Sequence, residues 1–283
     1  MAKMKVIYSE TCLEYSQPGH PESPERVRSS YEHLKSKYEV VKPEAAAEDD
    51  VLAVHTPDLV GLVRSGNFFD GDSPAYPKLY EHAILSVGGA IAASDFALKG
   101  IPAFSLLRPP GHHAGRNFLG GFCYFNNIAV AVTRALNEVE KIAILDFDCH
   151  HGNGTEDIFH GHENVLYVSL HQSPLYPGTG ITSDLNCLNF PVRAGTDEDE
   201  YMDILAVALE SVSNFDPGMI AVSAGFDTFK EDPITNVALE IETYGKIAQR
   251  IKALGRPVFS VLEGGYSASM PRCVEAYLEG LET

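Results

Sequence analysis

The chain has 283 residues, 45% of them hydrophobic, with ordinary glycine and proline contents, so intrinsic disorder and a collagen-like repeat are excluded. Lys and Arg number 21 against 39 Asp and Glu, and the resulting net charge of −18 argues against direct binding to the backbone of nucleic acids. Solubility is the simpler reason for such acidity, and long-range steering of a cationic substrate is the second.

Strands and helices alternate along the chain. Short apolar runs rich in β-branched residues predict strands, and longer segments behind helix-starting residues predict helices. Predicted strands cover residues 6–8, 102–107, 142–145, 165–171, 188–192, 219–224 and 257–262. Predicted helices cover residues 26–37, 49–63 with a break at 55–57, 80–98, a segment ending near 136, 155–159, 197–212 and 239–254.

This alternation predicts an α/β fold with a mostly parallel sheet and right-handed crossovers. No linker, repeat or low-complexity tract divides the chain, so we expect a single domain over residues 1–283. Residues 65–76 form a predicted loop that is too long for a plain connection, and long loops are often functional.

Cysteine usage and the amino-terminal residues indicate the compartment. Five cysteines without paired spacing indicate free thiols in a reducing environment. Residues 1–5 lead directly into the first strand without the apolar core of a signal peptide, and no apolar run reaches membrane-spanning length. We therefore expect a cytoplasmic protein that does not bind a membrane. The sequence carries no signal for its oligomeric state.

The segment 142–154 carries the strongest chemical signal. Its apolar run predicts a strand buried on both faces, and polar residues follow at the carboxyl end, where open parallel sheets bind ligands. Because side chains alternate along an extended chain, Asp146, Asp148 and His150 should point to one face. Two oxygen donors and one nitrogen donor suit a divalent metal such as Zn²⁺. A helix-capping loop would not explain two carboxylates and two histidines within six residues.

Three other predicted strands also end in polar side chains. His112 and His113 lie in a Pro- and Gly-rich loop after the strand at 102–107, which makes them candidates for acid–base catalysis. Asp227 follows the strand at 219–224, and by itself it reads as a helix cap or turn residue. Tyr266 follows the last strand and two glycines, which permit either an ordinary turn or a sharp one that aims the phenol into a cleft.

With these clusters in order, the chain resembles the zinc-dependent histone deacetylase family, including its bacterial members for acetoin utilisation and acetylpolyamine hydrolysis. The matching motifs span nearly the whole chain, at residues 19–27, 108–115, 121–127, 146–155, 167–171, 176–180, 223–227 and 262–266. Each motif is weak alone, but all of them in this order are specific. The resemblance implies the arginase-deacetylase fold, with the metal at the carboxyl ends of the strands.

Two metal sites are implied by the resemblance. The implied ligands of Zn²⁺ are Asp148, His150 and Asp227. Fe²⁺ is the alternative ion, because imidazole ligands serve both metals. A structural monovalent cation, usually K⁺, is implied beside Asp146, Asp148, His150, Ser169 and Leu170.

The resemblance also implies the catalytic residues. They are His112, His113, Tyr266, Asp146 and Asn153. Asp146 would pair with His112, and Asn153, which stands where some eukaryotic members have Asp, would pair with His113. Because Asn cannot ionise, His113 should be less biased toward imidazolium here. The Asn and the ending at 263–266 are similar to the class II and bacterial branches rather than to class I.

The implied substrate channel is narrow and suits an aliphatic acyl-amine chain. Its walls are Phe122 and Tyr176, with Gly121 and Gly265 beside them. The loop at 65–76, which carries Asp70 and Asp72, is expected to border the mouth of this channel, and no single residue of it is assigned to the substrate.

The expected reaction is hydrolysis of an acyl-amide. Zn²⁺ would polarise the amide carbonyl and lower the pKa of a water toward about 7. His113 is the expected base that takes the water proton and then protonates the leaving amine, with His112 as its electrostatic partner. Tyr266 would donate a hydrogen bond to the developing oxyanion.

Other functions remain open at the level of the sequence. The first is a change of substrate, from acetyl-lysine in a protein or peptide to an N-acetylpolyamine or another small acyl-amine. The second is a catalytically inactive binder of acyl-lysine, which loss of a ligand, a tandem histidine or the tyrosine would indicate, and none of these is missing. The third is an arginase-like dinuclear hydrolase, for which the strand ends carry too few carboxylates.

Overall fold

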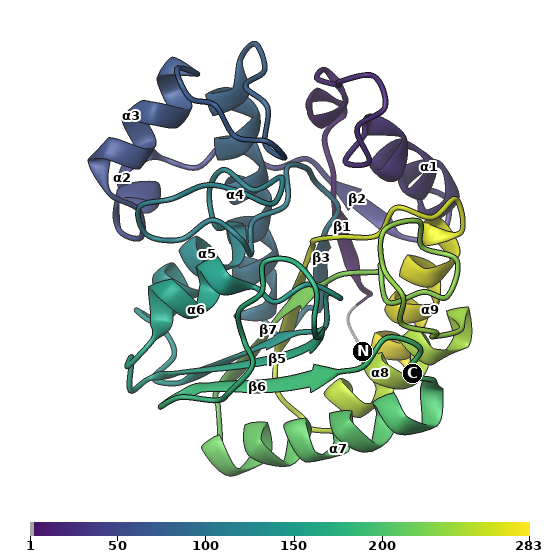
Figure 1. Ribbon diagram of the computed structural model, residues 1–283. Helices are drawn as coiled ribbons and strands as arrows, with labels where there is room; N and C mark the ends of the chain where they lie inside the picture. The colour runs from purple at the N-terminus through teal and green to yellow at the C-terminus, as the bar shows by residue number, and fades with distance from the viewer. Residues whose placement is uncertain (1–2) are drawn as a thin grey trace.

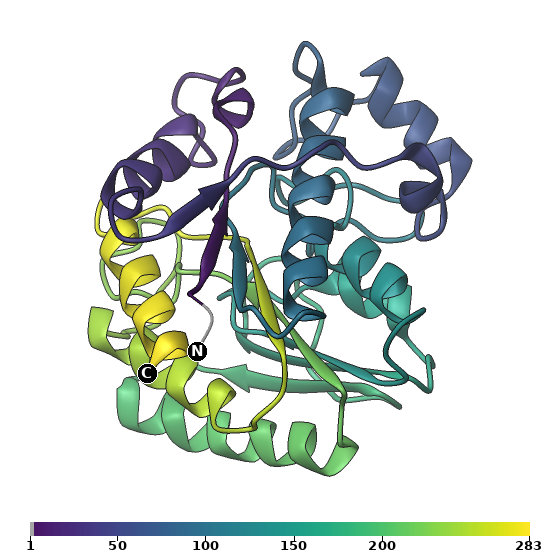
Figure 2. The same ribbon diagram turned by 180° about the vertical axis from the view of Figure 1, so that it is seen from behind.

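One parallel sheet lies between two layers of helices (Figures 1 and 2). The computed structural model describes residues 3–283. The strands are β1 (Lys5–Ile7), β2 (Glu39–Val41), β3 (Ala103–Ser105), β4 (Ile142–Asp146), β5 (Val165–Gln172), β6 (Cys187–Val192), β7 (Met219–Ala224) and β8 (Val258–Leu262). They lie in the order β2-β1-β3-β8-β7-β4-β5-β6, and every neighbouring pair is parallel.

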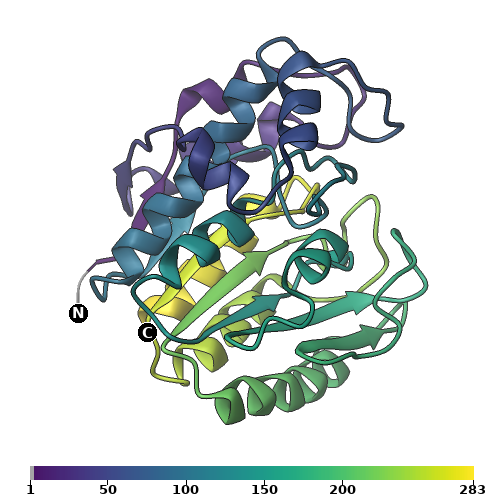
Figure 3. The same ribbon diagram turned by 90° about the vertical axis from the view of Figure 1, so that its left-hand side faces the viewer.

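The helices cover both faces of the sheet. They are the 3-10 helix η1 (Glu10–Leu13) and the α-helices α1 (Pro24–Leu34), α2 (Glu48–Leu52), α3 (Pro57–Ser65), α4 (Leu79–Ala97), α5 (Asn127–Ala135), α6 (Asn153–Phe159), α7 (Glu198–Phe215), α8 (Ile241–Lys252) and α9 (Met270–Glu282). On one side α8 packs between α7 and α9, and α9 also contacts α1; on the other α4 packs on β3, β8 and α5. Figure 3 shows the green α7 below the sheet and the blue helices above it.

The predicted α/β class is confirmed, and the sheet is parallel at every strand pair that the structure describes. The elements missed from the sequence are η1, β2 and α9. β2 has only three residues, all at least partly exposed, so it lacks the buried apolar run that marked the other strands. The prediction of a single domain over 1–283 stays a prediction, and its first two residues lie outside the described part.

Burial of the central strands explains their apolar sequences. All residues of β3, β4, β5, β7 and β8 are buried, since helices cover both faces there. Among residues 3–283, each helix is too short or too polar to cross a bilayer.

A buried ion-pair network ties the amino-terminal segment to the ends of β3 and β8. Arg108 donates hydrogen bonds to both carboxylate oxygens of Glu22 at 2.7 and 2.6 Å, and Arg26 donates to the same carboxylate at 3.1 Å. Arg26 also donates to the backbone carbonyls of Glu263 and Gly265, at 2.5 and 2.6 Å. Burial raises the pKa of Glu22, but the guanidinium groups outweigh it, so the pKa lies below its ordinary value. The network therefore holds two carbonyls of the turn that follows β8.

Candidate active site

Four neighbouring strands deliver polar side chains to one edge of the sheet. The adjacent strands β3, β8, β7 and β4 all end at this edge because they are parallel. The segments after them carry the tandem histidines (112–113), Tyr266, Asp227 and the cluster at 148–150. Residues far apart in the sequence thus meet at the carboxyl ends of the strands, where parallel α/β sheets bind ligands.

Asp148, His150 and Asp227 form the one group of potential metal ligands found among residues 3–283. One ligand atom from each lies within 4.8 Å of the others, and all three residues are buried. His150 Nδ1 lies 3.2 Å from Asp148 Oδ1 and 2.9 Å from Asp227 Oδ2. Ligands at about 2.0–2.2 Å from a tetrahedral Zn²⁺ lie roughly 3.3–3.5 Å apart, so the spacing is close to what a metal requires.

Backbone amides hold the carboxylates of Asp148 and Asp227 by hydrogen bonds. Asp148 Oδ2 accepts a hydrogen bond from Gly264 N at 2.7 Å, and Asp227 Oδ1 accepts one from Cys149 N at 2.8 Å. A Cβ on Gly264 would lie 2.5 and 2.6 Å from the Oδ2 atoms of Asp227 and Asp148, so only glycine fits. Burial and the Asp148 carboxylate raise the pKa of Asp227 to about 7. A divalent cation compensates such a buried carboxylate pair, so the residues present fit the metal.

Asp146 does not join this group, which corrects the expectation from side-chain alternation. β4 ends at Asp146, and the chain then leaves the extended conformation. Asp146 Oδ1 accepts a hydrogen bond from Asp148 N at 3.1 Å, and its Oδ2 lies 3.0 Å from both His112 Nδ1 and Tyr167 Oη. Asp146 therefore supports the segment 148–150 and His112, and Asp227, which follows β7, is the third member of the group of potential ligands.

The tandem histidines lie beside the ligand group with different partners. His112 Nδ1 lies 3.0 Å from Asp146 Oδ2, and His113 Nδ1 lies 2.8 Å from Asn153 Oδ1. The pairings that the resemblance implied are thus present as contacts. The two rings are 4.0 Å apart between centroids, and His113 lies 6.1 Å from His150.

These environments shift the pKa values of the two histidines in opposite directions. Burial lowers the pKa of His112, but the carboxylates of Asp146, Asp148 and Glu263 outweigh it and raise the pKa to about 10. Burial, together with the charges of His112 and His150, lowers the pKa of His113 well below its ordinary value. These directions favour the imidazolium form of His112 and the neutral imidazole form of His113. Pairs of titratable groups separated in this way mark acid–base assignments.

A cavity of about 210 Å³ opens above the ligand group. Its lining comprises Asp72, Pro110, His112, His113, Gly121, Phe122, Asp148, His150, Leu175, Tyr176, Ile234, Gly264 and Tyr266. Of the residues expected at the channel, Gly265 is not in the lining and Gly264 takes its place. The backbone of Gly265 has a φ of +116°, and a Cβ there would meet Phe226 and Met270, on the side away from the cavity.

Asp72 is the residue of the loop at 65–76 that reaches the cavity. The loop is held by its neighbours. The Asp72 carbonyl lies 3.1 Å from His20 Nε2, and Ser73 Oγ accepts a hydrogen bond from Phe122 N at 2.9 Å. Asp72 could not be chosen from the sequence, because only these contacts show which part of the loop faces inward.

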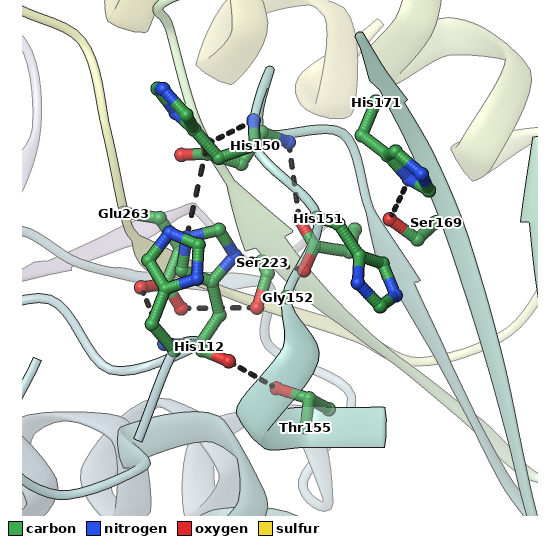
Figure 4. Close-up of polar contacts among 12 residues, drawn as sticks. His112, His150, His151, Gly152, Thr155, Ser169, His171, Ser223 and Glu263 are labelled. Carbon is green, nitrogen blue, oxygen red and sulfur yellow. Dashed lines mark hydrogen bonds and ion pairs between the residues drawn. The ribbon is translucent and has the colours of Figure 1, made fainter. Parts of the chain in front are cut away.

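Sequence reasoning also missed Glu263, which lies at the end of β8 and is fully buried. Its Oε2 accepts hydrogen bonds from Gly111 N at 2.7 Å and His112 N at 3.1 Å, and its Oε1 accepts one from Ser223 Oγ at 3.0 Å (Figure 4). The carboxylate therefore ties the tandem-histidine loop to β7 and β8. Polar residues directly after a buried parallel strand indicate a site, as they did for Asp148, and the same pattern could have identified Glu263.

The residues implied for a monovalent cation lie on β4 and β5 and just beyond β4. Asp146 and Ser169 are partners in the parallel register of β4 and β5. Ser169 Oγ lies 2.8 Å from His171 Nδ1, as Figure 4 shows, and Leu170 is buried. A cation at this place stays a prediction.

A buried Asp-His-Asp group at the strand ends of a parallel sheet, beside a tyrosine and two histidines whose pKa values shift in opposite directions, is the arrangement of a metal-dependent hydrolase. Similarity to known proteins identifies the family within this class of enzymes. The family model described as "Histone deacetylase domain" matches residues 20–281. A probable deacetylase of Archaeoglobus fulgidus is 38% identical, over 93% of this chain and 81% of its own length.

Two acetylpolyamine hydrolases are also similar to the chain. Acetylpolyamine amidohydrolase 1 of Pseudomonas aeruginosa is 37% identical over 70% of this chain and 61% of its own length. The crystal structure of acetylpolyamine aminohydrolase from Burkholderia pseudomallei superposes with a TM-score of 0.94 at 26% identity, covering 99% of each chain. The chain belongs to the histone deacetylase family, and it is a deacetylase, a hydrolase of amide C–N bonds.

Proposed function

We propose that the chain removes the acetyl group from the ε-amine of lysine in a protein or peptide, with Zn²⁺ held by Asp148, His150 and Asp227. The observation that carries this proposal is that Asp148 and His150 line a cavity that His113 and Tyr266 also line, with Asp227 beside them in the same group of potential ligands. Fe²⁺ is the alternative metal for the same ligands. K⁺ beside Asp146 and Ser169 is proposed as a structural ion.

The side chains around the metal site provide the proton transfers. When bound, a divalent metal polarises the acetyl carbonyl and lowers the pKa of a water to about 7. His113 Nδ1 donates to Asn153 Oδ1, so its neutral ring leaves Nε2 free to accept the proton of the attacking water and to return it to the leaving amine. The charged His112 stabilises negative charge beside it. Burial raises the pKa of Tyr266 well above its ordinary value, so its phenol remains a hydrogen-bond donor.

The walls of the cavity fit an extended aliphatic amine. The Tyr176 ring lies edge-on to His113 at 5.1 Å, and the Phe122 ring lies edge-on to Tyr266 at 5.9 Å, so aromatic groups flank the reacting atoms. Leu175 and Ile234 add apolar surface, and Asp72 contributes a carboxylate. A methylene chain that ends in an acetylated amine matches such walls, and the peptide to which it is attached would remain outside.

An N-acetylpolyamine is the second candidate substrate. The names of the Pseudomonas and Burkholderia relatives favour it, and Asp72 could pair with a second ammonium group of a polyamine. The net charge of −18 favours either cation through long-range steering.

Amine release from a panel of acetyl-lysine peptides and N-acetylpolyamines tests the proposal, with purified chain, added Zn²⁺ and a chelator. We expect peptide turnover that the chelator abolishes and Zn²⁺ restores. Turnover of polyamines alone would replace the first substrate by the second. Turnover of neither class would contradict both proposals.

Substitution of Asn153 by Asp should shift the pH dependence of kcat/KM. A carboxylate at hydrogen-bond distance from His113 favours its imidazolium and raises its pKa by roughly 1–3 units. His113 must be neutral to accept a proton, so activity on the acid side of the profile should fall and its acid limb should move to higher pH. The alkaline plateau should change less. A pH–rate profile that does not move would contradict the role of His113 as the base.

A further inference from the structure

Asp232 lies behind the cavity, in the segment between β7 and α8, and only 7% of it is exposed. Its carboxylate accepts two backbone hydrogen bonds. Oδ2 accepts one from Tyr266 N at 2.7 Å, and Oδ1 accepts one from Ile234 N at 3.1 Å. Asp232 itself is absent from the cavity lining, whereas Tyr266 and Ile234 both belong to it. One carboxylate thus holds two walls of the cavity that come from different loops.

The turn before Tyr266 needs such a restraint. Gly264 and Gly265 precede the tyrosine, and Gly265 has a φ of +116°, a region that glycine enters readily. A pair of glycines restricts the backbone little, so the direction of the phenol depends on contacts made by the residues around it. The short hydrogen bond from Tyr266 N to a buried carboxylate is charge-assisted and therefore among the stronger ones.

The remaining contacts of Tyr266 hold its ring and the residue before it. The Arg26 guanidinium lies 4.7 Å from the ring centroid, and the Phe122 ring lies edge-on at 5.9 Å. Arg26 Nε also donates to the Gly265 carbonyl at 2.6 Å. These contacts confine the ring and the Gly265 carbonyl, and Asp232 holds the amide of Tyr266 itself.

We propose that Asp232 is a positioning residue for Tyr266, which fixes the backbone of the tyrosine and the Ile234 wall so that the phenol faces the reacting carbonyl. The inference rests on the proposed function, in which Tyr266 donates to the oxyanion. Asp232 acts through Tyr266 and does not contact the substrate.

A double-mutant cycle on the metal-loaded full chain tests this role. Asp232→Ala removes both acceptor oxygens, and small displacements of a reacting group reduce turnover strongly. We expect kcat to fall about 10- to 100-fold while KM stays within about threefold. In a Tyr266→Phe background the same substitution should change kcat less than about twofold, because the hydroxyl that it positions is already absent. Glu231→Ala, an exposed carboxylate one residue away, is the matched control and should leave kcat unchanged.

Two kinetic outcomes would overturn the inference. The first is an equal loss of kcat in both backgrounds, which would show a general structural role. The second is an unchanged kcat in the single variant. If Asp232→Ala does not fold, as circular dichroism would show, Asp232→Asn replaces it, since its volume is nearly the same and it has one acceptor oxygen in place of two.

Hydrogen exchange of the peptide that contains Tyr266 gives a readout that does not depend on catalysis. The Tyr266 amide should exchange faster in Asp232→Ala than in the wild type, and Glu231→Ala should match the wild type. Equal exchange in all three proteins would overturn the inference. The wild-type chain could hydrolyse no acetyl-amide while the Tyr266 amide still exchanges faster in Asp232→Ala than in the wild type. That result would contradict the proposed function and would confirm that Asp232 holds this backbone.

Discussion

Substitution of Asp227 by Asn should abolish both metal binding and turnover. Asn keeps the shape of the side chain but has no negative charge and is a poor ligand, so two of the three potential ligands, Asp148 and His150, would remain. Without the metal, the attacking water is no longer activated, and we expect kcat to fall on the order of 10³-fold or more. Metal analysis of the purified variant beside the wild type, together with amine release, measures both effects.

The control for this substitution is Asp199→Asn, which makes the same chemical change at an exposed position in the first turn of α7. It should keep the metal content and turnover of the wild type. A wild-type chain treated with a chelator should have the low metal content and turnover of Asp227→Asn. Added Zn²⁺ should restore turnover to the treated wild type but not to Asp227→Asn. Full turnover by the Asn variant would show that Asp227 is not a ligand.

Substitution of Tyr266 by Phe should keep the metal and lose most of the turnover. The phenol belongs to a residue of the cavity lining, and Phe keeps the ring that contacts Arg26 and Phe122. Removal of one donor to a developing oxyanion typically costs about 10²–10³ in kcat. Because the donor acts on the transition state rather than on the bound substrate, KM should change little.

Tyr31→Phe supplies the matched control for this variant. Tyr31 packs against Tyr8 and is absent from the cavity lining, so loss of its hydroxyl should leave kcat unchanged. Steady-state kinetics with an acetyl-lysine peptide, at equal metal content, compares the three proteins. If Tyr266→Phe turned over at the wild-type rate, the oxyanion would have another donor.

The strand ends were predictable because parallel strands obey a simple rule. Apolar runs marked β4 and β7, and polar residues directly behind them marked Asp148 and Asp227. Chain order and the family motifs then sufficed to bring residues from four separate segments together. The rule works because all these strands end at the same edge of the sheet.

The supporting residues could not be predicted in the same way. Asp146 falls on the last position of β4, and alternation fails as soon as the chain leaves the strand. Asp72 and Asp232 act from irregular segments, where the direction of a side chain depends on turn conformations that have no simple period. α9, in contrast, could have been predicted, because its buried apolar residues recur with a helical period and proline is well tolerated in the first turn of a helix.

The order of strands in the sheet has a consequence for folding. β3 pairs with β8, and Phe104 is the register partner of Ser260, so the two strands that precede His112 and Tyr266 are separated by more than half of the chain. Contacts of such large sequence separation form slowly, because much of the chain must be ordered before they are made. Asp227 can join the proposed ligand group only after β7 has paired with β4. We therefore expect the proposed metal site to form late in folding, and recovery of activity after refolding should report completion of the central sheet rather than collapse of the chain.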